Sequence, residues 1–241
     1  MTTLYSYPPL VPGVLIRRYK RFFADVELAD GSLVTTHCPN TGPMTGISTP
    51  GSTVWLSQSS DPRRKLAYTW ELIEVEGTCV GVNTGLPNRI VARGLTEHAF
   101  AALEPYTTVQ PEVRYGAENS RIDFLLGAPD RPSLYLEVKN TTWTAGAGND
   151  RLALFPDCVT TRGQKHLREL TRIVELGGRA AILFFINRTD CLRFSPGDAA
   201  DPTYGRLLRE AVAAGVLVLP YRFAVTPTAV RLLGLVPLEF F

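Results

Sequence analysis

The sequence predicts an α+β protein of two domains, a small β-barrel followed by an α/β domain. Short β-rich runs separated by turn residues occupy the first third of the chain, as small barrels require. After residue 87, amphipathic helical segments alternate with strands, and residues 180–187 form a continuous apolar run typical of a central strand. We place the boundary at residues 83–87, which gives domains of residues 1–85 and 86–241.

Each strand of the first domain is a run of alternating or apolar residues bounded by turn signals. Asp30-Gly31 is a strong hairpin turn, and the segment 39–46 is dense in Pro, Asn, Thr and Gly. The expected strands are residues 14–16, 22–28, 33–38, 53–57, 67–73 and 78–82. Five or six strands within about 70 residues fit an OB-like barrel.

The second domain is expected to begin with a helix over residues 88–103, weakened at Gly94. Two strands, 120–126 and 133–140, follow it. An amphipathic helix over 163–176 places Leu167 and Leu170 on one stripe. Beyond the central strand, Pro202 is suited to the first turn of a helix that ends at Gly215, and 216–225 is the last expected strand.

Composition excludes several classes of protein. The 241 residues are 45% hydrophobic and 20% charged with a net charge of +2, which excludes intrinsic disorder. There is no apolar run of membrane-spanning length and no basic segment followed by an apolar one at the start, so we expect a cytoplasmic protein without a membrane partner. The four cysteines are far apart and lack zinc-site spacing, which indicates reduced thiols.

The candidate active site lies on the two strands at 120–126 and 133–140. Glu137 and Lys139 alternate onto one face of their strand, and a hairpin would bring Asp123 beside Glu137. Two adjacent carboxylates repel unless a cation neutralises them, and Mg²⁺ or Mn²⁺ held by Asp123 and Glu137 would do so. Lys139 would then stabilise charge developing on a phosphate. An Asp followed at this distance by Glu-x-Lys resembles the signature of PD-(D/E)xK nucleases.

A more specific resemblance covers roughly residues 10 to 225. The chain resembles the sugar fermentation stimulation protein A family on four segments, residues 38–42, 115–124, 137–139 and 155–167. The resemblance implies an N-terminal OB-like domain, a C-terminal domain similar to PD-(D/E)xK nucleases, and binding to DNA. It implies no settled reaction or substrate.

Candidate nucleic-acid contacts come from basic clusters and from turns that admit a phosphate. They are Arg17, Arg18, Lys20, Arg21, Asn40, Thr41, Arg121, Arg162, Lys165 and His166. The last three follow the turn at Thr160-Thr161, and their assignment rests mainly on the family resemblance. Glu118 is a candidate accessory contact to the metal or its water.

Two hypotheses remain open from the sequence. The first is a metal-dependent phosphodiesterase, a nuclease that cleaves DNA or RNA. The alternative is a non-catalytic DNA-binding regulatory protein that retains the nuclease fold. The presence of Asp123, Glu137 and Lys139 favours the first, whereas the oligomeric state is left open, with a homodimer among the options.

Overall fold

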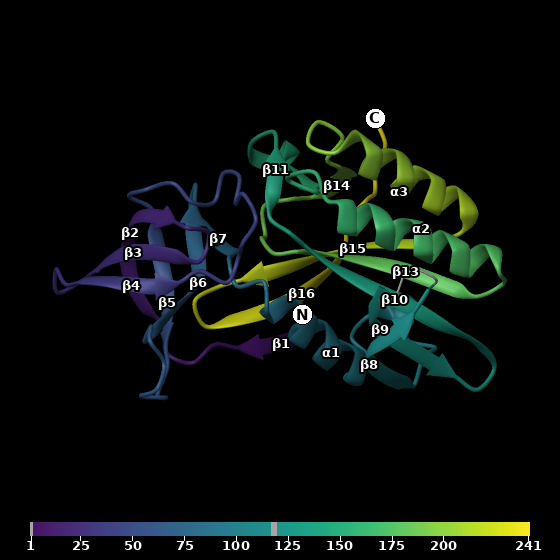
Figure 1. Ribbon diagram of the computed structural model, residues 1–241, viewed down its shortest axis with the longest axis horizontal. Coiled ribbons are helices and arrows are strands. Elements are labelled where there is room, and N and C mark those ends of the chain that lie inside the picture. Colours follow the sequence, from purple (N-terminus) through teal and green to yellow (C-terminus); the bar gives the residue numbers. More distant parts are fainter. Residues whose placement is uncertain (1, 117–119) are drawn as a thin grey trace.

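The protein consists of two lobes joined along one side (Figure 1). A computed structural model describes residues 2–116 and 120–241. The smaller lobe is a barrel and the larger is an α/β domain, as the sequence predicts. Within the described ranges, no helix has the length and apolar character needed to cross a membrane.

The barrel lobe contains six strands. They are β2 (Val11–Tyr19), β3 (Phe23–Leu28), β4 (Leu33–His37), β5 (Thr53–Gln58), β6 (Tyr68–Val75) and β7 (Thr78–Gly81). Their order is β4-β3-β2-β5-β6-β7, and a parallel pairing of His37 with Thr69 joins β4 to β6. That pairing closes a five-stranded barrel around Leu15, Val26 and Trp70, which are fully buried, with β7 added beside β6.

The larger lobe is built on a seven-stranded sheet of order β1-β16-β15-β13-β10-β9-β8. Its strands are β1 (Thr2–Ser6), β8 (Thr108–Tyr115), β9 (Ser120–Ala128), β10 (Arg131–Thr141), β13 (Arg179–Ile186), β15 (Leu217–Val225) and β16 (Ala229–Leu235). A three-stranded sheet of β11 (Trp143–Ala145), β12 (Leu152–Phe155) and β14 (Arg193–Pro196) lies beside it. Short 3₁₀ turns occur at Ala101–Leu103 and Gly148–Asp150.

Helices cover both faces of the seven-stranded sheet (Figure 1). One face packs against α1 (Leu86–Thr96), and the other against α2 (Thr161–Glu175) and α3 (Pro202–Ala214). Strand β13 lies between these layers and is buried from Ala180 to Ile186. Asp201 caps α3 by accepting a hydrogen bond from the Tyr204 N–H at 2.9 Å, beside the expected first-turn proline.

The first helix of the larger lobe is shorter than expected. It ends at Thr96, whereas the sequence pattern continues to residue 103. The chain folds back so that the ring of Phe100 packs on Gly94, where an added Cβ would lie 2.5 Å from Phe100 Cε2. The glycine that weakens the helical pattern therefore admits an aromatic ring into the core.

The strand order does not agree with a domain boundary that assigns all of residues 1–85 to the barrel. Strand β1 is hydrogen-bonded to β16 in the sheet of the larger lobe, with Thr2 opposite Leu232. Residues 2–6 thus lie in the second lobe, and neither β1 nor β16 is among the strands that the sequence predicts. The lobes also meet at Gly81, whose N–H donates to the Asn187 carbonyl at 3.0 Å.

Candidate functional site

Asp123 lies where β9 stops pairing with β10. The last paired residues of that hairpin are Phe124 and Leu136, so Asp123 and Glu137 follow next to each other in register. Beyond this point the Val138 N–H donates not to a β9 carbonyl but to Asp123 Oδ2, at 2.7 Å. Because N–H and C=O of one strand residue point to the same side, the Val138 carbonyl also faces this open edge of β10.

A second element holds the other oxygen of Asp123. Asn88, in the first turn of α1, donates its amide N–H to Asp123 Oδ1 at 2.8 Å. Burial, and then the nearby charge of Glu137, raise the pKa of Asp123 from 3.8 to about 6. Sequence spacing gives no signal for Asn88, because its role depends on a helix that is distant from Asp123 in sequence.

Glu137 is buried, with a side chain only 3% exposed. Its Oε1 accepts a hydrogen bond from Lys139 Nζ at 2.6 Å and contacts His166 Nδ1. Burial by itself raises the pKa of Glu137, but Lys139 and His166 outweigh that effect and hold the pKa below its usual value. Its second oxygen, Oε2, is buried without a hydrogen-bond partner among the described residues.

An unpartnered buried carboxylate oxygen is costly unless something else neutralises it. Glu137 Oε2 and Asp123 therefore fit a divalent cation, which prefers oxygen ligands. No group of three His, Cys, Asp or Glu side chains within residues 2–116 and 120–241 is arranged around one ion. Mg²⁺ typically takes only one or two carboxylates and completes its shell with water and substrate phosphate, so two carboxylates suffice.

His166 occupies a different place from the one expected. The sequence predicts a nucleic-acid contact at His166, but this residue is only 3% exposed and lies against Glu137. Arg162 Nε lies 3.5 Å from His166 Nε2, and Lys139 Nζ lies 3.3 Å from His166 Nδ1, the nitrogen that contacts Glu137. His166 therefore orients a carboxylate, whereas Arg162 is exposed at the first turn of α2.

The candidate contacts on the barrel lobe divide into two groups. Arg18 is half-buried and donates from Nη2 to the carbonyls of Asn40 and Gly42, both at 2.9 Å. It therefore stabilises the loop at residues 39–46. Arg21 also donates to the loop, to the Thr41 carbonyl at 2.8 Å, although its side chain is exposed. Arg17 pairs with Asp25 at 2.8 Å but remains 67% exposed, and Lys20 is exposed.

The remaining expected contacts lie on the larger lobe. Arg121 on β9 is exposed and pairs with Glu112 at 3.3 Å. Lys165 is half-buried on α2, within one turn of Arg162. Glu118 lies outside the described residues. The structure thus gathers Asp123, Glu137, Lys139, His166 and Arg162 at one place and leaves the barrel contacts as a second group.

Comparison with known proteins assigns the chain to a family. Residues 85–229 match a family model described as the sugar fermentation stimulation protein RE domain, and residues 16–82 match the SfsA N-terminal OB domain. The sugar fermentation stimulation protein homolog of Gloeobacter violaceus is 64% identical over 97% of each chain, and that of Synechococcus elongatus is 61% identical over 98% of each.

A solved structure is similar over the whole length. It is described as Pyrococcus furiosus SfsA in complex with Ca²⁺, and it shares 25% identity with a TM-score of 0.88 over 100% of both chains. The first lobe is therefore an OB domain. Together, the two matched domains and the relatives above 60% identity show that the chain belongs to the sugar fermentation stimulation protein family.

Proposed function

We propose that the chain is a DNA-binding protein whose second domain is a divalent-cation-dependent phosphodiesterase. The observation that carries this proposal is the buried Oε2 of Glu137, which lies beside Asp123 and has no partner among residues 2–116 and 120–241. A site built only for stability would pair that oxygen, because an unmade buried hydrogen bond is destabilising. A relative described as bound to Ca²⁺ supports a cation with oxygen ligands.

Asp123 and Glu137 would hold Mg²⁺ or Mn²⁺, with the Val138 carbonyl facing the same edge. When bound, such a cation supplies Lewis acidity and lowers the pKa of a coordinated water. Asn88 and the Val138 N–H fix Asp123, while His166 fixes Glu137. These contacts preorganise both carboxylates, which favours electrostatic catalysis.

Lys139 would stabilise the charge that develops on the attacked phosphate. Its ammonium bonds Glu137 Oε1 and so lies at the carboxylates, while its side chain keeps 13% of its surface exposed. Arg162, exposed one turn from the buried His166, would contact a phosphate of the same strand. The two basic groups therefore flank the carboxylate pair.

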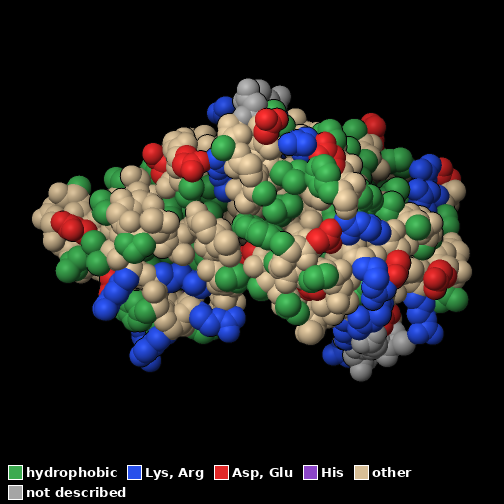
Figure 2. Space-filling model, turned by 90° about the horizontal axis from the view of Figure 1, so that it is seen from above, with side chains coloured by type: hydrophobic (Ala, Val, Ile, Leu, Met, Phe, Trp, Pro, Cys, Tyr) green, Lys and Arg blue, Asp and Glu red, His purple; other side chains and the backbone are tan. Residues whose placement is uncertain are grey.

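A positively charged path supports binding of a nucleic-acid backbone. Figure 2 shows Lys and Arg side chains on both lobes, on either side of a notch between them. On the barrel side, Lys20 and Arg21 form the exposed tip of the β2–β3 hairpin. A strand lying in this notch would contact both lobes.

The decisive experiment is a cleavage assay. Labelled single-stranded and double-stranded DNA and RNA are incubated with Mg²⁺ or Mn²⁺ and with wild type, Asp123→Ala or Glu137→Gln. Cleavage by wild type that both variants lack supports the proposal. Binding without cleavage above the Asp123→Ala level would instead support the alternative, a DNA-binding regulatory protein that retains the nuclease fold.

A further inference from the structure

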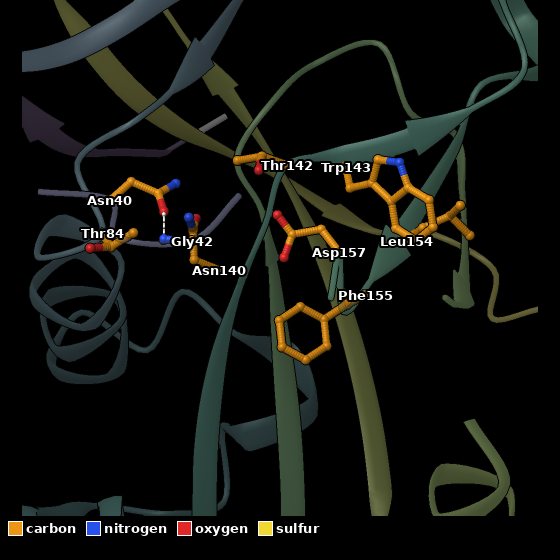
Figure 3. A pocket seen from close by; sticks show the side chains of 9 residues that line it. All are labelled: Asn40, Gly42, Thr84, Asn140, Thr142, Trp143, Leu154, Phe155 and Asp157. Atoms are coloured by element: carbon orange, nitrogen blue, oxygen red, sulfur yellow. Dashed lines mark hydrogen bonds between the residues drawn. The ribbon is translucent and has the colours of Figure 1, made fainter. Parts of the chain in front are cut away.

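A small pocket lies between the lobes (Figure 3). Its volume is about 90 Å³. The pocket joins two segments that are distant in sequence, the barrel loop after Cys38 and the chain after Phe155, and the site proposed above uses neither. Its principal lining residues are Asn40, Thr84, Asn140, Trp143, Phe155 and Asp157.

The barrel side of this pocket is held in place by hydrogen bonds. Arg18 binds the carbonyls on either side of Thr41, and Thr84 Oγ1 donates to the Pro39 carbonyl at 3.0 Å. Asn40 Oδ1 accepts from the Gly42 N–H at 3.0 Å. The amide oxygen of Asn40 is therefore occupied, and its NH₂ group is the part left to meet a ligand.

The opposite wall is polar and aromatic. Asn140, the residue after Lys139 on β10, accepts a hydrogen bond at Oδ1 from Asn187 Nδ2 at 3.0 Å. It too has its amide oxygen occupied and its NH₂ available. Trp143 supplies aromatic surface (Figure 3), and such surfaces stack on nucleobases, whereas the Phe155 ring packs against Phe184 and Tyr204 and closes the pocket on that side.

Asp157 places a carboxylate between these walls (Figure 3). Burial raises the pKa of Asp157, and hydrogen bonds from its own backbone and from the Cys158 thiol offset this only in part. Within the described part of the chain it has no ion pair with Lys, Arg or His. A ligand that offers N–H donors to this carboxylate would therefore be stabilised.

We propose that this pocket receives the edge of an unpaired guanine base. The Watson–Crick edge of guanine presents N1–H and N2–H side by side, and a carboxylate accepts both. The NH₂ groups of Asn40 and Asn140 suit the guanine acceptors O6 and N7. About 90 Å³ admits a base edge rather than a whole nucleotide, so the ring stays at the aromatic mouth.

This inference rests on the proposed binding of nucleic acid and adds the base that is recognised. Asn140 follows Lys139 on β10 with its side chain on the opposite face, so the guanine would lie at the end of the strand that carries Glu137 and Lys139. It predicts that cleavage, where it occurs, falls beside unpaired guanines rather than at random.

The test measures base preference without cation, so that it does not depend on cleavage. Fluorescence anisotropy in EDTA gives dissociation constants for dT oligomers that carry one central dG, dA, dC or deoxyinosine. The dG oligomer is expected to bind wild type about tenfold more tightly than the dA and dC oligomers, the scale of one bidentate base contact. Deoxyinosine, which lacks the 2-amino group, should fall between dG and dA.

Asp157→Asn should abolish this preference while it leaves the affinity for plain dT oligomers unchanged, since the substitution keeps the shape of the side chain. Asp130→Asn, on the exposed turn between β9 and β10, is the matched control and should keep the preference. Equal affinities for all oligomers, or a preference that survives Asp157→Asn, would overturn the guanine pocket and leave the proposed function standing. Failure of every oligomer to bind would overturn both it and the proposed function.

Discussion

The Asp123 carboxylate takes the place of a strand neighbour by accepting the backbone N–H of Val138 at 2.7 Å. The Asp123 side chain thus replaces the missing backbone acceptor at the point where β9 and β10 separate. The arrangement satisfies the backbone of β10 and holds a carboxylate at the open edge of the sheet, next to Glu137. Sheet geometry rather than a flexible loop therefore positions this side of the site.

The raised pKa of Asp123 predicts that its charge destabilises the cation-free protein. Because the folded-state pKa of about 6 lies above the ordinary 3.8, the free energy of unfolding should fall as pH rises from about 4 to 6. Asp123→Asn should remove this dependence and stabilise the cation-free protein by about 1–3 kcal/mol at pH 7. Urea unfolding in EDTA at pH 4, 5, 6 and 7 measures both effects, and equal stability of the two proteins at pH 7 would contradict them.

His166 is predicted to act by positioning Glu137. His166→Gln should weaken divalent-cation binding by about 10- to 100-fold, the scale for groups that orient a ligand. DNA binding in EDTA should be unchanged, because His166 is buried and does not reach the surface. Calorimetry and anisotropy on the same preparation separate the two readouts. A loss of DNA affinity with cation affinity intact would restore the surface role that the sequence suggested.

The barrel arginines are predicted to differ in their effects. Arg17→Ala with Lys20→Ala should flatten the slope of log K against log salt by roughly 1 to 2, as loss of one or two phosphate contacts does. Arg18→Ala should instead lower the thermal midpoint, because Arg18 braces the loop after Cys38. Arg93→Ala, on α1 and paired with Glu97, is the control for the salt slope. An unchanged slope in the double variant would exclude this part of the barrel from the interface.

Gly94→Ala tests the packing that ends α1 early. The added Cβ would meet Phe100 Cε2 at 2.5 Å, so the ring or the helix must shift. We expect a loss of about 1–3 kcal/mol in the free energy of unfolding. Ala92→Gly on the same helix controls for helix propensity. A gain in stability for Gly94→Ala, as expected at an exposed helix position, would show that the ring does not pack on this glycine.

Much of the fold follows from local pattern. The hairpin at Asp30-Gly31, the buried run of β13 and the capped start of α3 are confirmed because each is encoded within a few neighbouring residues. Strands β1 and β16 were missed because each is stabilised by the other across the whole chain. The end of α1 was missed because it depends on Phe100 folding back onto Gly94.

The candidate site divides in the same way. Motif spacing places Asp123, Glu137 and Lys139 together, since they lie on one hairpin. Motif spacing does not identify Asn88, which reaches Asp123 from α1, and it does not predict the burial of His166. The pocket around Asp157 could not be predicted either, because its walls come from both lobes and meet only in the folded chain.

The central claim is that Asp123 and Glu137 hold one divalent cation. Isothermal titration of the metal-free protein with MgCl₂ and MnCl₂ tests it directly, for wild type, Asp123→Ala, Glu137→Gln and Lys139→Ala. The account predicts one site in wild type, none in the two carboxylate variants, and a retained site in Lys139→Ala. Lys139→Ala should still reduce any cleavage by about 10²-fold or more. Cation binding of equal affinity in wild type and Asp123→Ala, or none in wild type, would contradict the account.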